Sequence, residues 1–331
     1  MTQPQYDVVA IGNAIVDVIA QSDDAFLAQH ALTKGGMQLI DTQTADLLYS
    51  EMSAAREVSG GSAANTLAGL AALGKKCGFI GQVADDQLGR IFAHDIRAIG
   101  VDFDTPATSE GEPTARCLVL VTPDAQRTMN TFLGASQNLP AEALDDALIT
   151  SAGILYLEGY LWDPEEPRKA MRHAIRIAKK AGRKVAFTLS DGFVIDRHRD
   201  DFMSLIEEGL IDILFSNEAE IQALAQIDGF DKAVTAISAH VPLLISTRSE
   251  KGAVAISDGT RYEVYAAGVS DVIDTTGAGD LFAAGFLAAY VEEQDIETCL
   301  KLGAVAAAEV ISHYGARPEA DLKQLRAKAG L

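Results

Sequence analysis

The amino-acid sequence predicts a three-layer α/β/α fold with a mainly parallel central sheet and a small β-sheet lid. Two observations predict the core: from about residue 140 short apolar segments alternate with helical ones, and the end of the chain is largely helical. A third observation predicts the lid, because extra, less apolar strands interrupt the alternation before residue 140. No repeat or low-complexity linker divides the chain. We therefore expect one domain over residues 1–331, with a lid from about residues 14–42 and 102–134.

The N-terminal part of the chain mixes a βα pattern with the strands of the expected lid. Residues 6–11 form an apolar strand that ends at Gly12-Asn13, and residues 15–20 continue as a second extended run. The other elements expected here are strands at residues 37–40, 116–121 and 127–132, and helices at residues 62–73 and 88–99.

The C-terminal part alternates regularly between the two kinds of element. Strands are expected at residues 153–157, 184–189, 211–215, 242–246 and 253–256, and helices at residues 167–181, 199–208, 218–225 and 231–238. This alternation predicts parallel strands with helices on both faces. Ligands of such sheets bind beyond the carboxyl ends of the strands, so polar and glycine-rich segments there are the candidate sites.

The charge balance excludes one class of partner. The 331 residues include 27 Lys plus Arg against 47 Asp plus Glu, which gives a formal net charge of −20. The residues before and after position 150 both carry a negative net charge, whereas binding to a nucleic acid requires cationic side chains that neutralise its phosphates. We therefore expect small-molecule ligands and no nucleic acid.

The cysteine spacing and the apolar segments indicate a cytoplasmic protein. Cys77, Cys117 and Cys299 lie far apart and have no spacing typical of a metal site or a disulfide framework. The N-terminus lacks the features of a signal peptide, and the most apolar segments are too short to cross a bilayer. We expect no membrane partner, and a monomer and a homodimer both remain open.

The sharpest candidate site is Asp274-Thr-Thr-Gly-Ala-Gly-Asp280. Its small residues form a turn before an uncharged helix, where the backbone N–H groups of Gly277, Ala278 and Gly279 could surround an anion. Asp280 would face that anion, and acceptance of a proton from an attacking hydroxyl would explain a carboxylate there. We expect the helix N-terminus to favour the ionised form of Asp280. The alternative is that Asp280 only caps the helix and the glycines only form a turn.

Two further segments could contact a polar ligand. In Gly60-Gly-Ser-Ala-Ala-Asn65, Gly60 and Gly61 permit close approach, and Asn65 offers both a donor and an acceptor; the alternative is a tight turn before a closely packed helix. Asp17 lies in an apolar run after Gly12-Asn13 and needs a partner. Two neighbouring hydroxyls of a sugar would serve, and so would an Arg.

A fourth segment, Asn217-Glu-Ala-Glu220, follows the strand expected at residues 211–215. Glu220 could orient water around Mg²⁺, which takes few protein ligands and keeps its waters; alternatively, it is an ordinary acid in the first turn of a helix. The glycine segments match neither the Gly-x-x-x-x-Gly-Lys-[Ser/Thr] phosphate loop nor the Gly-x-Gly-x-x-Gly fingerprint of dinucleotide binding. The second mismatch counts against a dehydrogenase.

Together these segments resemble the ribokinase-like (PfkB) family of carbohydrate and nucleoside kinases. Residues 60–65 with the helix after them resemble its first signature, residues 274–285 its second, and Asn217-x-x-Glu220 its Asn-x-x-Glu motif. The likeness extends over about residues 6–318. It implies a ribokinase-like core with a β-sheet lid, and transfer of the ATP γ-phosphoryl group to a hydroxymethyl group.

The resemblance also implies roles for single residues. Asp280 matches the base, and residues 277–279 match the anion hole. Asn217 and Glu220 match residues that affect Mg²⁺ and phosphate, and Glu220 would act through water. Asp274 and Thr276 match positions that hold a monovalent cation in some members, so K⁺ is a further expected ion beside ATP and Mg²⁺.

Within the family the likeness is closest to the adenosine kinases. Arg127 lies in a segment similar to the one whose Arg reaches the phosphate as the lid closes. Tyr160 and Phe193 stand where adenosine kinases place rings around the nucleobase, although either ring could be ordinary core packing. The residues that match ribose contacts are Asn13, Asp17, Gly61 and Asn65.

The expected nucleotide-binding segments depart from the family pattern. Thr247-Arg-Ser249-Glu-Lys-Gly252 resembles the ATP-binding Thr-x-Gly-x-x-Gly segment, but Ser249 replaces the first Gly. Ala304 stands where related kinases often carry Asn or His near the adenine. The pocket is therefore expected to be more apolar than usual, and preference for ATP over GTP stays open.

The resulting expectation is an ATP- and Mg²⁺-dependent kinase that phosphorylates the 5′-hydroxymethyl group of a nucleoside, most favourably adenosine. A sugar kinase of the same family, acting on ribose or fructose, is the first alternative. The second is a non-catalytic protein that binds a nucleoside or a nucleotide, against which the intact Asp280 and its glycine turn argue.

Overall fold

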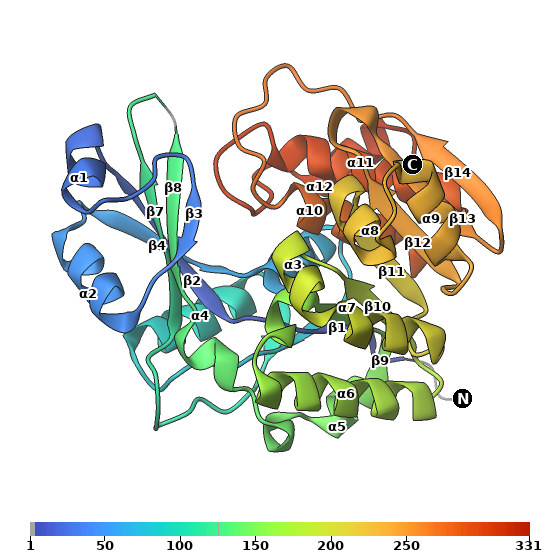
Figure 1. The fold of residues 1–331 in the computed structure, drawn as a ribbon, viewed down its shortest axis with the longest axis horizontal. Coiled ribbons are helices and arrows are strands. Elements are labelled where there is room, and N and C mark those ends of the chain that lie inside the picture. Colours follow the sequence, from blue (N-terminus) through green and yellow to red (C-terminus); the bar gives the residue numbers. More distant parts are fainter. Residues whose placement is uncertain (1–3, 125) are drawn as a thin grey trace.

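A nine-stranded sheet forms the centre of the larger part of the molecule (Figure 1). The computed structural model describes residues 4–124 and 126–331. Neighbouring strands of this sheet are parallel except in the pairs that involve β13. In spatial order the strands are β14 (Thr260–Val264), β13 (Ala253–Ser257), β12 (Leu243–Thr247), β11 (Ile213–Asn217), β10 (Lys184–Thr188), β9 (Ala152–Glu158), β1 (Tyr6–Ile11), β5 (Cys77–Ile80) and β6 (Val101–Phe103).

Helices cover both faces of this sheet, as the alternation predicts. Successive residues of β1 mark the two faces, because Val8 belongs to one hydrophobic cluster and Val9 to the other. One face carries α3 (Ser62–Ala72), α4 (Gln87–Ala98), α10 (Ala278–Tyr290), α11 (Ile296–Val310) and α12 (Leu322–Lys328). The other carries α5 (Asp146–Ser151), α6 (Glu165–Lys180), α7 (Gly192–Glu207), α8 (Glu218–Ala225) and α9 (Phe230–Ser238). In the described residues, no helix is both long and apolar enough to cross a membrane.

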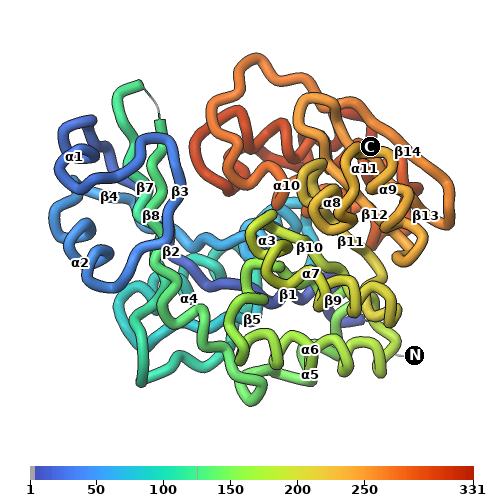
Figure 2. The backbone as a smooth tube through the Cα atoms, viewed as in Figure 1, coloured from blue at the N-terminus to red at the C-terminus, as the bar shows by residue number. Residues whose placement is uncertain are grey.

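A second, five-stranded sheet stands at one side of the first, and we call it, with α1 (Asp24–Gln29) and α2 (Thr42–Glu51), the lid (Figures 1 and 2). One face of its strands packs against these two helices through residues such as Val16 and Leu118. Asp17, one position along, therefore points to the opposite face. In spatial order the strands are β3 (Met37–Leu39), β8 (Arg127–Phe132), β7 (Ala115–Val121), β2 (Ile15–Gln21) and β4 (Ala55–Gly60).

The lid differs from its expected extent at two points. Strand β4 belongs to it although residues 55–60 lie outside the expected 14–42 and 102–134, and β6, at the start of the second range, pairs with β5 of the large sheet. The residues of β4, Ala-Arg-Glu-Val-Ser-Gly, carry two charges on an edge strand, so no apolar alternation marks them. The strands β5, β6 and β14 were also missed; the first two are only four and three residues long.

Helix α7 begins at Gly192, seven residues before the expected start at 199. His198 interrupts it with non-helical angles, φ −126° and ψ 19°, and the pattern expected from 199 corresponds to the part after this kink. The helix starts at an N-cap, since the Asp191 carboxylate accepts a hydrogen bond from the Phe193 N–H over 2.7 Å. The earlier start places Phe193 in the first turn, at the edge of the site described next.

Candidate active site

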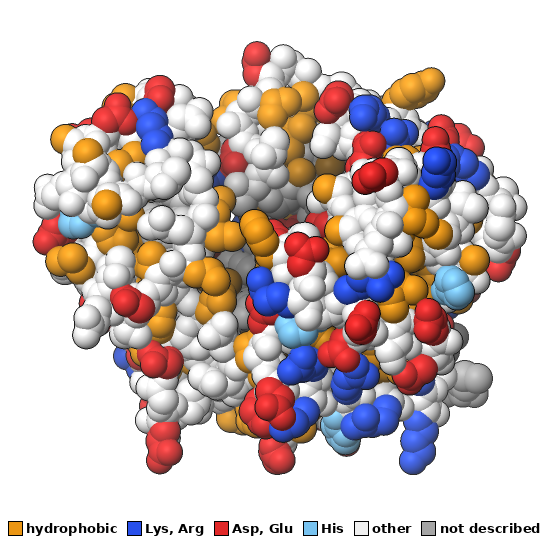
Figure 3. Space-filling model, viewed as in Figure 1, with side chains coloured by type: hydrophobic (Ala, Val, Ile, Leu, Met, Phe, Trp, Pro, Cys, Tyr) orange, Lys and Arg blue, Asp and Glu red, His pale blue; other side chains and the backbone are white. Residues whose placement is uncertain are grey.

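A cavity of about 770 Å³ lies between the lid and the carboxyl ends of the central strands. It is where open α/β sheets bind ligands. The space-filling view shows the molecule hollowed between the two parts (Figure 3). The predicted residues that line the cavity are Asn13, Asp17, Gly61, Asn65, Arg127, Tyr160, Phe193, Asn217, Glu220, Thr247, Thr276, Gly277, Ala278, Gly279 and Asp280.

The Asp280 carboxylate is held by two side chains of α3. Its Oδ1 accepts a hydrogen bond from the Ser62 hydroxyl over 2.6 Å, and its Oδ2 accepts one from Asn65 Nδ2 over 3.2 Å. Burial raises the pKa of Asp280 to about 6, and these two hydrogen bonds and the charge of Arg317 oppose the rise. Desolvation thus outweighs the influences that favour the ionised form of Asp280, and its pKa lies above the ordinary value of an Asp. A carboxylate with a raised pKa is a better proton acceptor.

The turn before α10 leaves backbone N–H groups free beside Asp280. Gly277 has φ +78°, and a Cβ on it would lie 2.7 Å from Ala316 Cβ, so only glycine fits. Within the described part of the chain, the N–H groups of Gly277, Gly279 and Asp280 make no hydrogen bond. The Ala278 N–H donates to the Thr275 carbonyl over 3.2 Å, contrary to its expected place in the anion hole. The free donors at this helix N-terminus can still bind an anion.

The Asp17 carboxylate lines the cavity without a partner, since it makes no hydrogen bond or ion pair with any described residue. Burial raises the pKa of Asp17 to about 6, and the more distant charges of Arg317 and Arg127 oppose the rise. Gly60 packs directly against it, because a Cβ there would lie 2.6 Å from Asp17 Oδ2. The Arg ion pair considered as an alternative is thus not formed, and the carboxylate is free to accept hydrogen bonds from a ligand.

Glu158 organises the neighbouring part of the cavity, although the sequence did not single it out. It is fully buried, its Oε1 accepts hydrogen bonds from the backbone and side-chain N–H groups of Asn13, both over 2.7 Å, and its Oε2 accepts one from the Ala63 N–H. Burial raises the pKa of Glu158 to about 7. Asn13 Oδ1 is taken by the Ser136 hydroxyl, so Asn13 keeps one side-chain N–H for a ligand.

Arg127 and Asp274 form an ion pair between the lid and the core. The two Asp274 oxygens also accept hydrogen bonds from the Thr276 N–H and hydroxyl and from the Gly315 N–H. These four interactions use the roughly four acceptor sites of a carboxylate. Asp274 and Thr276 therefore do not fit the expected monovalent cation in this arrangement, because the guanidinium of Arg127 supplies the positive charge.

Asn217 and Glu220 form a capping box at the start of α8. Glu220 Oε1 accepts a hydrogen bond from Asn217 Nδ2 over 2.6 Å and its Oε2 accepts one from the Asn217 N–H over 3.0 Å, while burial raises the pKa of Glu220 to about 7. Each oxygen keeps a lone pair, which fits contact with a water on Mg²⁺. No group of three metal-binding side chains occurs among the described residues. Mg²⁺ would thus depend mainly on phosphate oxygens and water.

Of the residues expected to bind the nucleotide, some line the cavity and others lie outside it. Thr247 lines the cavity, but Ser249, Gly252 and Ala304 do not. Ser249 and Gly252 lie in the turn between β12 and β13, where a Cβ on Gly252 would lie 2.0 Å from the Val264 carbonyl oxygen. Ala304 is buried within α11. Contact of these three residues with ATP stays a prediction.

Apolar side chains face one another across the mouth of the cavity. Met37 and Leu39 of β3 are 53% and 64% exposed although they line it, and Phe193 on the core side is 74% exposed. Met129 of β8 and Tyr160, beside β9, also line it. Exposed apolar side chains gathered at one cavity indicate a ligand with an apolar part.

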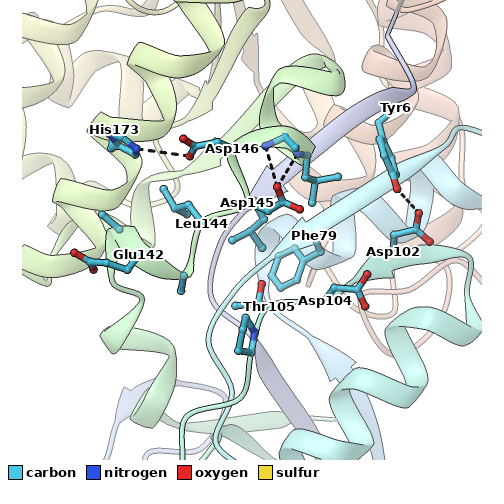
Figure 4. Close-up of a pocket in the computed structure, with 16 residues that line it drawn as sticks. Tyr6, Phe79, Asp102, Asp104, Thr105, Glu142, Leu144, Asp145, Asp146 and His173 are labelled. Carbon is cyan, nitrogen blue, oxygen red and sulfur yellow. Dashed lines mark hydrogen bonds and ion pairs between the residues drawn. The ribbon is translucent and has the colours of Figure 1, made fainter.

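A second cavity, of about 820 Å³, lies apart from these residues, between the start of β1 and the segment around α5 (Figure 4). Its carboxylates include Asp102, which accepts a hydrogen bond from the Tyr6 hydroxyl over 2.6 Å, and Asp145, which caps α5. Asp104 and Glu142 also line it, and among the described residues His173 is the single basic side chain there. Because so acidic a lining disfavours phosphates, this cavity is not the nucleotide site.

Arg317 is a second residue that sequence reasoning missed. It lies in the loop between α11 and α12, and its Nε donates a hydrogen bond to Asn65 Oδ1 over 3.0 Å. A single Arg-Pro pair in a loop carries no motif, and its partner lies 252 residues away in the chain. Ser62 was also missed, although it lies within the Gly60–Asn65 segment, as the first residue of α3.

Free N–H groups at a helix N-terminus, a carboxylate beside them and a lid over the carboxyl ends of a parallel sheet define a phosphotransferase that acts on hydroxyl groups. Residues 6–322 match the pfkB family carbohydrate kinase, and the chain belongs to this family. Kinases of the family phosphorylate hydroxyl groups of sugars and nucleosides, and they use ATP with Mg²⁺.

Similar structures include proteins named for both kinds of acceptor. A probable sugar kinase from Rhizobium etli CFN 42 is 46% identical, with a TM-score of 0.91 over 99% of both chains. The adenosine kinase from Sinorhizobium meliloti is 47% identical, with a TM-score of 0.90 over 98% of this chain and 99% of that one. The 5-dehydro-2-deoxygluconokinase of Halalkalibacterium halodurans is 28% identical over 324 residues, which cover 95% of this chain and 91% of the relative.

Proposed function

We propose that the protein is a nucleoside kinase that transfers the γ-phosphoryl group of ATP to the 5′-hydroxymethyl group of adenosine. The observation that carries this proposal is the apolar mouth of the cavity. Met37 and Leu39 of the lid and Phe193 of the core leave a slot that suits a flat, apolar base. A free sugar carries hydroxyls around its whole ring and gains little from such a slot.

The ribose would bind deeper in the cavity, at the polar residues below the slot. The unpartnered Asp17 carboxylate can accept hydrogen bonds from two neighbouring hydroxyls. Asn13 offers its remaining side-chain N–H, and Gly61 lines the same part of the cavity. Asp280 lies next to Asn65 in the same cavity, so the 5′-hydroxyl would reach the carboxylate from the ribose site.

The chemical step follows from these positions. The 5′-oxygen attacks the γ-phosphorus, the bond between that phosphorus and the β–γ bridging oxygen breaks, and ADP leaves with the bond's electron pair. Asp280 accepts the hydroxyl proton. The N–H groups of Gly277 and Gly279, with Arg127, stabilise the negative charge on the phosphoryl group as it moves.

The nucleotide would extend from the glycine turn toward Thr247 and the turn at Ser249 and Gly252. Mg²⁺ would neutralise the charge of its phosphates. Glu220 and Asn217 lie at the carboxyl end of β11 beside this path, and Glu220 would hold a water on the ion. Arg127, which lines the cavity on the lid side, would contact the same phosphates.

A sugar kinase is the second candidate function. The polar floor formed by Asp17, Asn13 and Asn65 would suit a free sugar, and the likeness to sugar-type kinases favours it. A substrate panel separates the two. ADP release is measured with adenosine, ribose, fructose and 5-dehydro-2-deoxygluconate, each with ATP and Mg²⁺.

The nucleoside proposal expects the highest kcat/KM with adenosine. A higher value with any of the free sugars would replace it by the sugar kinase. Absence of ADP release with every acceptor, in a protein that still binds adenosine by calorimetry, would instead support a non-catalytic binding protein.

A further inference from the structure

Arg317 lies outside the cavity, behind the residues that hold Asp280. Its Nε donates to Asn65 Oδ1 over 3.0 Å, and its Nη2 donates to the carbonyl and hydroxyl oxygens of Ser59 over 2.6 and 3.0 Å. The planar guanidinium thus joins helix α3 to strand β4 with two of its nitrogens. A Lys could not hold both partners in this geometry, because an ammonium group is a single point.

The hydrogen bond from Arg317 determines which way the Asn65 amide faces. Because Oδ1 accepts from Arg317, Nδ2 is turned toward Asp280 Oδ2, at 3.2 Å. The opposite orientation would set the amide oxygen against a carboxylate oxygen and leave the guanidinium facing an NH₂ group. Both contacts would be repulsive, so Arg317 selects the orientation in which Asn65 holds Asp280.

The residues before Arg317 contact the same catalytic turn. The Gly315 N–H donates to Asp274 Oδ2 over 2.9 Å, and Ala316 packs against Gly277 so closely that a Cβ there would collide with it. Gly315 and Ala316 therefore contact the turn before α10, and the next residue, Arg317, contacts Asn65, which holds the Asp280 carboxylate. Such packing restricts where Arg317 can lie.

Ser59 fixes the other end of the guanidinium. Its N–H and its hydroxyl both donate to Asp95 Oδ2, over 2.8 and 2.6 Å. The single hydroxyl proton goes to Asp95, so the lone pairs of the Ser59 oxygen remain to accept from Arg317. A continuous chain of hydrogen bonds thus runs from α4 through a lid strand and Arg317 to Asp280.

We propose that Arg317 is a positioning residue for phosphoryl transfer, which fixes the orientation of Asn65 and, through Asn65, aims the Asp280 carboxylate at the acceptor hydroxyl. The proposal rests on the function proposed above, since it takes Asp280 as the proton acceptor. The charge of Arg317 also lowers the pKa of Asp280 and of Asp17 against the effect of burial. Arg317 thus acts on Asp280 in two separable ways, through the orientation of Asn65 and through its own positive charge.

Substitutions at Arg317 separate these contributions. Arg317→Met removes both, so we expect kcat to fall roughly tenfold to 100-fold and the acid limb of kcat/KM to move up by about one pH unit. Arg317→Lys keeps the charge, so kcat falls while the acid limb stays near the wild-type position. The matched control is Arg199→Met, because Arg199 donates to the Leu224 carbonyl and does not line the cavity. It is expected to leave kcat and the pH profile unchanged.

An Arg317→Met protein with wild-type kcat and acid limb would overturn the proposal. An Arg317→Met protein with a lower melting temperature and an unchanged pH profile would also overturn it, because that result would show that Arg317 has only a structural role. If Arg317→Met does not fold, a double-mutant cycle of Arg317→Lys and Asn65→Ala tests the proposal, with kcat measured at saturating substrate. Their effects on kcat should not add, since one residue acts through the other, and additive losses would contradict the proposal.

The failure of this proposal differs from a failure of the proposed function. If Asp280→Asn keeps wild-type turnover, Asp280 is not the proton acceptor and both proposals fall. If Asp280→Asn abolishes turnover while the Arg317 variants behave as wild type, the base remains and only the role of Arg317 is rejected.

Discussion

Arg127 of the lid and Asp274 of the core are joined by an ion pair between residues 147 positions apart in the chain. Both side chains are nearly buried, at 9% and 6% exposure. Arg127 Nε is also buried and has no partner among the described groups. The pair joins the lid to the core and keeps Arg127 beside the cavity that it lines.

Removing the negative charge of Asp274 should loosen the lid. In Asp274→Asn the amide can still accept from Thr276, but its NH₂ group no longer attracts Arg127. We expect faster hydrogen–deuterium exchange in peptides from β8 and a lower melting temperature, because breaking a buried ion pair costs about 3–5 kcal/mol. Asp231→Asn is the control, since it breaks a surface pair with Arg261. Unchanged exchange in β8 of Asp274→Asn would show that the pair does not hold the lid.

The occupied carboxylate of Asp274 also predicts that the activity does not depend on K⁺. Four hydrogen bonds use its acceptor sites, and Arg127 supplies the charge that a bound cation would supply. The initial rate of ADP release should therefore agree within twofold in KCl and in choline chloride of equal ionic strength, at saturating Mg²⁺. A rate that rises several-fold with K⁺ would mean that the ion displaces Arg127 from Asp274.

Asp280→Asn tests the proton acceptor. The amide keeps the shape of the side chain and the contact with Ser62 but cannot accept the proton, so we expect kcat to fall by roughly 10²–10⁴-fold. Binding of the acceptor, measured by calorimetry, should change little. Turnover within tenfold of the wild type, with binding intact, would reject Asp280 as the base.

The sequence predicted the parts of the site that lie in short segments. Asp17, Asp280 and the glycines before α10 stand out because a charged or conformationally special residue interrupts an apolar run. The layered core was predictable for the same reason, since buried strands and helices leave a local periodicity. The edge strand β4 shows no such periodicity, because charged residues occupy two of its six positions.

The contacts that complete the site could not be predicted from local pattern. Ser62 and Asp280 lie 218 residues apart, and Arg317 and Asn65 lie 252 apart, so only the folded chain pairs them. The raised pKa of Asp280 was hidden for a related reason. The helix N-terminus is visible in the sequence, whereas the burial that outweighs it depends on how the chain folds around the carboxylate.

Phe193 should contribute to binding of the acceptor nucleoside, through its base, and should not contribute to binding of ATP. Removal of its ring in Phe193→Ala takes away one wall of the slot. Because stacking on a base contributes about 1–3 kcal/mol, KM for adenosine should rise about fivefold to 160-fold. KM for ATP should stay within twofold. Tyr265→Ala is the control, because Tyr265 is 91% exposed and does not line the cavity. An unchanged KM for adenosine would place the base elsewhere.

The desolvated carboxyl group of Asp17 should make the folded state less stable at alkaline pH. Burial raises the pKa of Asp17 from 3.8 to about 6. Its contribution to stability is therefore complete below pH 4 and lost as pH rises through 6, because the folded state must then hold a desolvated charge. Asp17→Asn removes that charge and should raise the free energy of unfolding at pH 8 by up to about 3 kcal/mol.

At pH 4 the same substitution should have almost no effect, since Asp17 is then largely protonated in the folded state. Urea unfolding at the two pH values measures the difference directly. Asp41→Asn is the control, because Asp41 is an exposed N-cap whose pKa is lowered by its hydrogen bonds with Thr44, and it should give no gain at pH 8. Equal effects of Asp17→Asn at pH 4 and pH 8 would show that packing, and not the desolvated charge, sets the cost of this site.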